Sequence, residues 1–364
     1  MALSHPVSKK NGKVRGLGNP VLVKRNIRVS LLAGVAVAGM VARAQAATYE
    51  VDVKTNTTLT SPIVTPPGYT QVTYGVGSGA TLTLGAGSNP TSTFYAKSIA
   101  GGGLLINNTT ITTSGTAVAY DGNNFSYPIL SFTNNGTILS AVSAGQYALS
   151  VGSYQFGNLV NTGSITTTGA GGAVNAGPNY NFTNSGSVAA DGLAVYAFDS
   201  VLTNSGTIRS NTGVGAYLYG NVGYPASSSG SIYGQTIGVQ ILGPTLTNTG
   251  TITSPGLAAS LDPYGTLINA AGGTVNGNIG AALYGYTFRA GLDNAGTING
   301  NVNFGTSFSG SGNVVTLRPG SVITGNLVIG GGNDTFAVSL VNNGPGQFAG
   351  VNGTVTAPEP APIP

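Results

Sequence analysis

A five-residue phrase, Asn-Xaa-Gly-(Thr/Ser)-(Ile/Val), recurs through the middle of the chain and constrains its fold more than any other feature. Six full copies begin at Asn134, Asn161, Asn184, Asn204, Asn248 and Asn294, with glycines two positions on at Gly136, Gly163, Gly186, Gly206, Gly250 and Gly296. Weaker copies begin at Ser228 and Asn269. Successive copies are 27 residues apart at the longest (134 to 161) and 20 at the shortest (184 to 204). A period of this size is the signature of a repeat protein.

Each repeat holds three short apolar runs separated by Gly, Asn, Ser or Pro. An apolar residue stands two positions before each leading residue: Phe132, Leu159, Phe182, Leu202, Ala226, Leu246, Leu267 and Leu292. The second run is the stretch that contains the Ile or Val of the phrase. The third is a mid-repeat patch such as Ala216-Tyr217-Leu218. We therefore predict an all-β fold, a right-handed parallel β-helix (solenoid) with about 20–27 residues per rung. Eight rungs would form a rod on the order of 40 Å long.

The residue types of the phrase suit a tight turn between strands. Asn and Gly accept left-handed backbone angles that β-branched residues resist. We therefore expect the Asn and Gly of the phrase to adopt such angles at the turn. Asn side chains at the same place in successive rungs can hydrogen bond to one another in a ladder, as stacked Asn does in cross-β assemblies. The Ile or Val that follows then points inward and fills the core.

Two other folds compete with the solenoid. The chain has 59 Gly and only 6% charged residues, a composition found in disordered linkers. A linker, however, has no reason to keep apolar residues in register. A β-sandwich of short strands does not repeat one phrase at this period. The repeat therefore favours the β-helix over both.

The N-terminus has the character of an export signal. Residues 1–28 are basic, an apolar run follows over 30–41, and Ala44-Gln45-Ala46 is a small-residue cleavage pattern before Ala47. These features predict a secretory signal peptide with an extended basic region over 1–46, in which Ala44 and Ala46 form the cleavage site before Ala47. The apolar run is shorter than the ~20 residues that a membrane-spanning helix needs. We expect an exported protein, at the cell surface or outer membrane or secreted.

The leader also accounts for the basic balance of the chain. Residues 1–46 hold eight of the 13 basic residues and the one histidine, His5, but no acidic residue. The remainder has five basic residues against nine acidic ones, a difference of −4. A mildly acidic exported chain argues against nucleic acid or anionic lipid as a partner.

Beyond the leader the chain divides into three parts. Residues 47–103 contain strand-like runs that do not follow the repeat, and we expect them to form an N-terminal capping β segment over the open edge of the first rung. Residues 104–340 are the β-helical repeat body. Residues 341–364 are rich in Pro and are predicted to be a tail or linker.

The end of the repeat body changes character. There Val315-Thr316-Leu317-Arg318-Pro319-Gly320-Ser321 leads through Ile323-Thr324-Gly325 to Asp334-Thr335-Phe336. Together with the Asn-Xaa-Gly-Thr-Ile rungs and the extended basic leader, this pattern resembles the passenger domains of Gram-negative autotransporters. The resemblance covers about residues 1–340. It implies a β-helical, adhesin-like passenger.

One part of such proteins has no counterpart in this sequence. In the family, a folding-promoting segment and an outer-membrane translocator barrel follow the passenger. No alternating barrel strands with aromatic girdles occur in the 364 residues. We expect the translocator barrel in a longer full-length product or supplied separately, or a chain that is released without one.

The residue inventory narrows the chemistry. There is no Cys, and the one His lies in the leader, so Ser-His-Asp and Cys-His catalysis and His-ligated metals are excluded for the exported part. The alternative function is a β-helical carbohydrate-active enzyme, a polysaccharide lyase or hydrolase, which needs paired carboxylates or a basic cluster. The candidate residues are Asp191, Asp199, Asp262, Asp293, Arg209 and Arg289. We interpret the acids as solvated turn residues and expect no enzyme, no catalytic residue and no cofactor.

One stretch near the end is similar to a metal-binding repeat. Gly330-Gly331-Gly332-Asn333-Asp334 matches a single copy of the calcium-binding nonapeptide. Such sites depend on successive copies that share calcium between turns. We therefore interpret Asp334 as a turn residue and predict no metal site.

The repeats are also rich in tyrosine, at Tyr147, Tyr154, Tyr180, Tyr196, Tyr217, Tyr219, Tyr224, Tyr233, Tyr264, Tyr284 and Tyr286. Tyr among Ser, Gly and Asn is typical of binding surfaces, including those that stack on sugar rings. Because several of these residues fall on the inward patch, we expect them instead to fill wide rungs and to pair with neighbours above and below.

These observations predict a surface adhesin or structural surface protein that acts through many weak contacts along a rigid rod. The expected partner is a host or bacterial cell surface, including its glycans. A purely structural stalk, with its active tip elsewhere, is a third possibility. Deletion of rungs separates these two functions: it should weaken the binding of an adhesin, whereas it should only shorten the reach of a stalk.

Overall fold

The structure is a computed structural model. It describes residues 48–69, 71–100, 102–120, 131–151, 157–281, 289–304, 312–329, 334–338 and 355–356. The predicted signal peptide, with Ala44 and Ala46, lies outside the described residues, as does most of the predicted tail. Within the described ranges every regular element is a β-strand, so none of them contains a helix that could cross a membrane.

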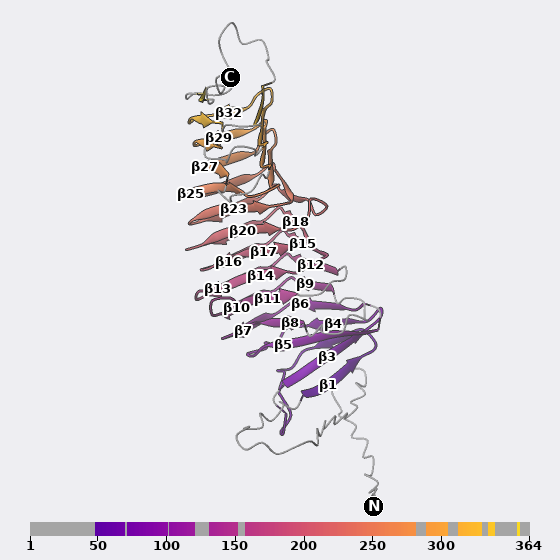
Figure 1. Ribbon diagram of the computed structural model, residues 1–364. Helices are drawn as coiled ribbons and strands as arrows, with labels where there is room; N and C mark the ends of the chain where they lie inside the picture. Colours follow the sequence, from indigo (N-terminus) through magenta and orange to yellow (C-terminus); the bar gives the residue numbers. More distant parts are fainter. Residues whose placement is uncertain are drawn as a thin grey trace, which may run out of the picture.

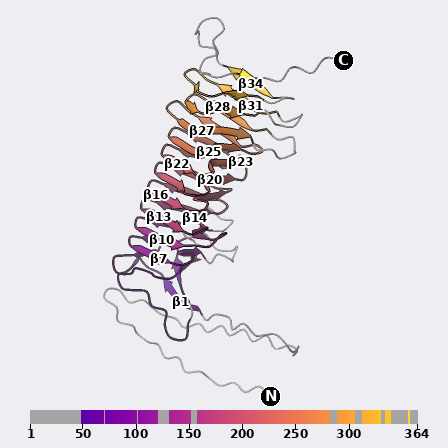
Figure 2. The same cartoon turned by 90° about the vertical axis from the view of Figure 1, so that its left-hand side faces the viewer.

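The strands stack in parallel ladders along a rod, from β1 near one end to β34 near the other (Figures 1 and 2). The first ladder is a 13-stranded sheet. Its strands are β2 (Thr57–Leu59), β4 (Thr81–Leu84), β6 (Leu104–Asn107), β9 (Ser131–Asn134), β12 (Gly157–Asn161), β15 (Tyr180–Asn184), β18 (Val201–Asn204), β21 (Ala226–Ser228), β24 (Thr245–Asn248), β26 (Thr266–Asn269), β28 (Gly291–Asn294), β31 (Val314–Leu317) and β34 (Thr335–Val338).

The remaining 22 strands form one sheet that covers two faces of the rod. The second ladder contains β7 (Thr110–Thr113), β10 (Thr137–Ala141), β13 (Ser164–Thr168), β16 (Ser187–Ala190), β19 (Thr207–Ser210), β22 (Ser231–Gly234), β29 (Thr297–Asn299) and β32 (Val322–Ile323). The third ladder contains β1 (Thr48–Val53), β3 (Gln71–Gly77), β5 (Phe94–Ala100), β8 (Val118–Tyr120), β11 (Tyr147–Val151), β14 (Gly172–Ala176), β17 (Val195–Phe198), β20 (Val214–Tyr219), β23 (Ile237–Leu242), β30 (Val302–Asn303), β33 (Leu327–Val328) and β35 (Val355–Thr356).

Two long strands join these two faces. β25 (Thr251–Leu261) and β27 (Thr274–Ala281) each supply one segment to the second ladder and one to the third, with register shifts between the segments. From β6 to β33 each turn of the chain thus contributes one strand, or one segment of a long strand, to each of three ladders. The predicted all-β parallel solenoid is confirmed, and the register steps of 27 and 20 residues between stacked Asn residues match the predicted rung length.

The core is made of columns of similar side chains, one per turn. In the second ladder an inward column contains Ile111, Ile138, Ile165, Val188, Ile208, Ile232, Ile252, Val275, Ile298 and Ile323. All are at most 1% exposed. The apolar residues that precede the phrase form the matching column of the first ladder and are buried too. Burial of each aliphatic side chain contributes about 1.5–3 kcal/mol, so the columns hold the turns together.

Asn side chains form the predicted ladder at the turn between the first and second ladders. Nδ2 of Asn134 donates to Oδ1 of Asn161 at 2.7 Å, and Asn161 donates to Asn184 at 2.7 Å. The row extends from Asn107 to Asn204 and resumes from Asn248 through Asn269 to Asn294. These side chains are at most 1% exposed. Their mutual hydrogen bonds satisfy polar groups that would be costly to bury alone.

The Asn row has one interruption. Ser228 occupies the Asn position of its turn and accepts a hydrogen bond from Nδ2 of Asn204 at 3.1 Å. On the next turn, Oδ1 of Asn248 is buried and has no hydrogen-bond partner among the described residues. A serine is too short to reach both neighbours. The weak copy of the phrase is therefore a gap in an otherwise continuous polar row.

The glycine of the phrase serves a different purpose from the one predicted. None of the six glycines has a backbone φ in the left-handed range, so that expectation was wrong. Instead, a Cβ on Gly163 would lie 2.0 Å from the carbonyl oxygen of Gly136, and a Cβ on Gly186 would lie 2.0 Å from that of Gly163. Glycine is required because the backbones of successive turns approach too closely for any side chain.

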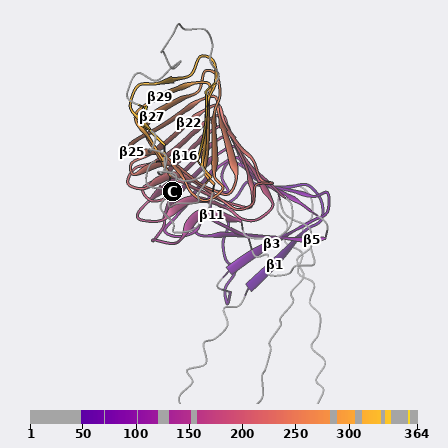
Figure 3. The same cartoon turned by 45° about the horizontal axis from the view of Figure 1, so that its top comes forward.

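The segment before the repeat continues the same ladders. β1 pairs with β3, and β3 with β5, in the parallel sense of the third ladder, while β2 pairs with β4 in the first. β35, in the predicted tail, pairs with β33. Figure 3 looks partly along the rod and shows β1, β3 and β5 beside one another at the N-terminal end. Stacking therefore extends beyond the eight turns that the phrase marks.

Candidate functional site

Asp191 and Asp199 lie on one turn, whereas Asp262 and Asp293 lie on two others. Asp191 and Asp199 stand at opposite ends of β17, a strand of four residues that spans roughly 13 Å. That span exceeds the ~5–9.5 Å between the carboxylates of glycosidases. Asp191 is half-buried and accepts from Nδ2 of Asn211 and from the backbone N–H of Gly169, both at 3.0 Å. These hydrogen bonds, that of Asn211 first, lower the pKa of Asp191, so it stays ionised.

The other two acids are held in local contacts. Asp262 is buried and accepts from Nε2 of Gln240 at 2.7 Å, and burial raises the pKa of its carboxyl although this hydrogen bond opposes the shift. Asp293 forms a bidentate ion pair with Arg318, with N–O distances of 2.6 Å. The pair is solvent-exposed and of small energetic value. The expectation that this chain is not an enzyme stays a prediction.

Of the glycine-rich stretch near the end, Gly330–Asn333 lie outside the described residues. Asp334 accepts from the backbone N–H of Asn313 at 2.9 Å, which is the contact of a turn residue. Of the predicted lyase cations, Arg209 stacks on Tyr233 at 4.5 Å from the ring centroid and donates from Nε to Oδ1 of Asn211, whose Nδ2 in turn donates to Asp191. Arg289 lies on a different turn from Arg209. The described part of the chain holds no cluster of three acidic or His residues that could bind a metal.

The tyrosines lie mostly on the outside, contrary to the expectation that they fill wide rungs. Tyr180 is inside and 1% exposed, but Tyr196, Tyr217 and Tyr219 point outward, and Tyr219 is 38% exposed. On β17 and β20 the intervening residues are the buried ones, so alternation settles the direction. Tyr154, Tyr284 and Tyr286 lie outside the described residues. The predicted pairing with neighbours above and below is confirmed, but it takes place on the surface.

Five outward rings form what we call the aromatic ridge: Tyr147, Tyr196, Phe198, Tyr217 and Tyr219. Phe198 and Tyr219 stack with centroids 5.1 Å apart, and Tyr196 and Tyr217 lie 5.5 Å apart. These distances follow from the spacing of neighbouring strands, since the two rings of each of these pairs stand on adjacent turns. The ridge crosses β11, β14, β17 and β20, shown in magenta to red in Figure 1.

A glycine gives the ridge its continuity. Tyr147 is in register with Gly172 on the next turn, and a Cβ on Gly172 would lie 2.4 Å from the Tyr147 ring. The ring therefore lies across the bare backbone of that turn and reaches Tyr196 at 6.5 Å. The pKa of Tyr147 is raised mainly by burial and to a smaller degree by the neighbouring Tyr196. The pKa of Tyr196 is raised mainly by burial and to a smaller degree by Tyr219 and Asp199. Both phenols are uncharged at neutral pH.

Polar groups border the ridge. In register with Tyr196 and Tyr217, Asn175 and Gln240 continue the outward row on the turns below and above. Beyond Phe198, Asp199 accepts from the backbone N–H of Asn221 at 2.8 Å and from its side chain at 3.1 Å. The ridge is thus a half-exposed apolar strip bordered by amides and a turn carboxylate. Such a mixture is typical of protein surfaces that bind a partner.

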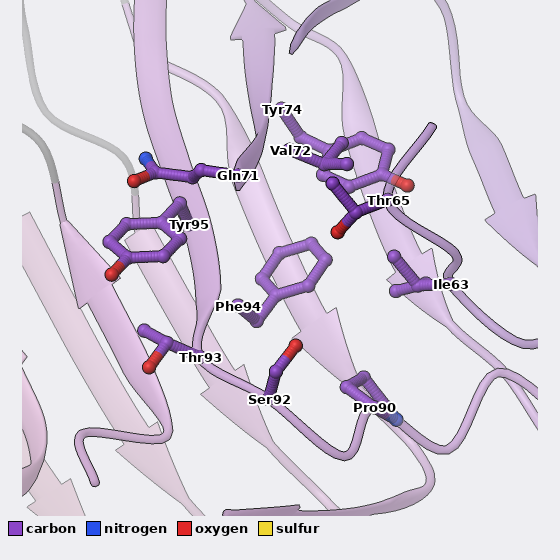
Figure 4. Close-up of a pocket in the computed structure, with 10 residues that line it drawn as sticks. All are labelled: Ile63, Thr65, Gln71, Val72, Tyr74, Pro90, Ser92, Thr93, Phe94 and Tyr95. Atoms are coloured by element: carbon purple, nitrogen blue, oxygen red, sulfur yellow. The ribbon is translucent and has the colours of Figure 1, made fainter. Parts of the chain in front are cut away.

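A pocket that the sequence did not reveal lies near the N-terminal end of the rod (Figure 4). It is lined by Ile63, Thr65, Gln71, Val72, Tyr74, Pro90, Ser92, Thr93, Phe94 and Tyr95, and we call it the N-terminal pocket. The loop before β3 and the loop before β5 meet there. The signal in the sequence is the repeated arrangement of a Pro-containing loop followed by a strand with aromatic residues.

Two stacked rings lie at the base of this pocket. Tyr74 and Phe94 are on neighbouring strands, with centroids 5.1 Å apart and ring planes at 14°. They are 8% and 3% exposed. Burial, and to a smaller degree the nearby Tyr49, raises the pKa of Tyr74 to about 12. The base of the pocket is therefore aromatic, rigid and uncharged at neutral pH.

Comparison of the chain with known protein families, with curated proteins and with solved structures finds no match.

Proposed function

We propose that this protein is an exported β-helical passenger that acts as a surface adhesin or structural surface protein. The observation that carries the proposal is the aromatic ridge on a rigid rod. A contiguous row of half-exposed rings is uncommon on proteins that have no partner, because such rings gain free energy when another surface covers them. The predicted leader over 1–46 supports export, and the resemblance to autotransporter passengers supports surface display.

The rod suits contacts that are individually weak. With 13 strands in the first ladder, it is on the order of 60 Å long and presents the ridge in a fixed geometry. Several weak contacts made at once by one rigid body bind far more tightly than any one of them. The partner we propose is a host or bacterial cell surface, including its glycans. Nucleic acid is disfavoured, since the chain after residue 46 has five basic against nine acidic residues.

Beads coated with the full chain test adhesion directly. We expect them to attach to host or bacterial cells, and the double variant Tyr217→Ser/Tyr219→Ser to attach about 10-fold less, because central aromatic residues dominate binding energy. The matched control is Tyr233→Ser, which removes an outward Tyr from the second ladder. Equal attachment by the ridge variant and the parent would contradict the proposed role of the ridge.

Protease treatment of intact cells tests location. We expect peptides from 47–340 to disappear, and we expect mass spectrometry to find peptides of a translocator barrel in the same product or in a second protein. A chain that stays protected in the periplasm would rule out surface adhesion.

A further inference from the structure

We propose that the N-terminal pocket binds one ring of an uncharged sugar. The proposal concerns a different part of the rod from the aromatic ridge and does not depend on it. It rests on the size of the pocket, on its stacked aromatic base and on the ring of hydroxyl and amide groups around that base.

Size limits the ligand to a single ring. The cavity volume is about 200 Å³, below the ~300–1,000 Å³ of sites for drug-sized ligands. A hexose residue is of this size, whereas a peptide segment or a dinucleotide is much larger. Thr65 and Ser92 in the lining of the pocket are exposed, so a sugar ring at the end of a longer glycan can enter with the rest of the glycan outside.

The base of the pocket suits the C–H face of a pyranose. Phe94 stacks on Tyr74 at 5.1 Å, which fixes the orientation of both rings. The two rings are 8% and 3% exposed, so they offer the C–H groups of a sugar a small apolar contact at the floor of the pocket. Because the rings are already ordered, little conformational entropy is lost when a ligand covers them.

The rim supplies hydrogen bonds of both kinds. In Figure 4 the hydroxyl groups of Thr65 and Ser92 point toward the ring of Phe94 from two sides. Both residues are exposed and come from different loops. Gln71 lies above Tyr95 on the opposite side and donates from Nε2 to the hydroxyl of Thr73 at 2.9 Å. Hydroxyl groups donate and accept, as the hydroxyls of a sugar require.

Charge selects the class of sugar. All ten residues that line the pocket are uncharged. A uronate or sialate carboxylate would lose hydration there without a cationic partner, which is unfavourable. A purely apolar ligand would leave the rim hydroxyls without water. The pocket is therefore matched to a neutral, hydroxylated ring.

The chain has no Trp, so one substitution makes a specific reporter. In the full chain carrying Tyr95→Trp, emission from the single Trp is followed during titration with glucose, galactose, mannose and N-acetylglucosamine. We expect at least one of them to change the emission with a Kd on the order of 1 mM, as befits a ligand with about a dozen heavy atoms. Saturation-transfer NMR on the unsubstituted chain is expected to show the same sugar bound.

Two variants in the reporter background locate the sugar. Ser92→Ala removes one hydroxyl and is expected to weaken binding about 3- to 10-fold. Thr65→Phe fills the cavity and is expected to abolish binding. Its matched control is Thr247→Phe, which places the same ring on the outward side of β24 and is expected to leave binding unchanged.

The proposal would be overturned by no response to any neutral sugar, by equal binding after Thr65→Phe, or by a response to indole or phenol without one to sugars. Glucuronate is expected to bind at least 10-fold more weakly than glucose, and tighter glucuronate binding would also overturn it. The ridge variant Tyr217→Ser/Tyr219→Ser is expected to bind the sugar normally. Loss of cell attachment with normal sugar binding therefore separates the two proposals.

Discussion

The middle of the rod and its N-terminal end share the same ladders but fill them differently. From β9 to β28 most turns place Asn on Asn and Ile on Ile or Val, with Gly beneath a carbonyl oxygen. From β1 to β5 parallel pairing continues in the first and third ladders, with one register shift between β3 and β5, and the phrase is absent. There Tyr74 stacks on Phe94, and a pocket lies beside them.

This difference separates two contributions to the fold. Parallel pairing uses backbone groups that every turn possesses, so it tolerates a change of side chains. Close, uniform packing requires identical side chains at identical places, because only these repeat at the strand spacing. The regular middle is therefore closely packed, whereas the irregular end has room for a ligand. Three predictions test this contrast, in order of expected effect.

The largest effect is expected from Gly163→Ala. The added Cβ would lie 2.0 Å from the carbonyl oxygen of Gly136, so the two turns must separate and the Asn row beside them must stretch. We expect destabilisation of roughly 3 kcal/mol, measured as a lower urea midpoint by circular dichroism. The control is Gly115→Ala, where no atom lies within 4 Å of the new Cβ. A change of less than about 0.5 kcal/mol for both variants would show that close approach does not matter.

The N-terminal end is expected to be the alkali-sensitive part. The pKa of Tyr74 is about 12 in the folded chain against 10.0 for an ordinary Tyr. Because the folded pKa is the higher one, the stability is intact below pH ~10 and falls as the pH rises through about 12, by ~2 kcal/mol. Urea unfolding measured from pH 9 to 12 is expected to show a smaller loss in Tyr74→Phe than in the parent, because Tyr147 and Tyr196, whose pKa values are also raised, remain in both. An equal loss in both would assign the effect to other residues.

The smallest effect is expected where the middle of the rod departs from its own pattern. Ser228→Asn would let the new amide accept from Asn204 and donate to the unpartnered Oδ1 of Asn248. We expect a gain of about 1 kcal/mol, seen as a higher thermal midpoint. Ser227→Asn is the matched control, because that neighbour points outward. A gain from both variants would reflect strand propensity rather than completion of the row.

The repeated phrase predicted much of the fold because its physical cause is local. Ile138 and Ile165 recur at one position of each rung, and stacking identical β-branched residues places them in one inward column. The Asn row followed from the same argument, since Asn134 and Asn161 must meet if their turns stack. The reason given for Gly163 was wrong, because its conformation is set by the neighbouring turn and not by its own φ.

The candidate surfaces were less predictable. Tyr217 follows Ala216 and precedes Leu218, all three of them residues that a core can accept, so composition did not show which one faces outward. The N-terminal pocket depends on Thr65 and Ser92, which are 27 positions apart and belong to no repeated phrase. Nothing local to either residue indicates that they lie beside the same ring.

By itself, then, the sequence determined that this chain stacks in rungs, where the rungs turn and which side chains stand above one another. These are consequences of a period, and a period can be read without coordinates. Only the tertiary structure decided that glycine prevents a collision between turns, that the rings of Tyr196 and Tyr217 face outward, and that two loops enclose a pocket at the N-terminal end. Each of these depends on distances between residues of different turns, which follow from packing in three dimensions.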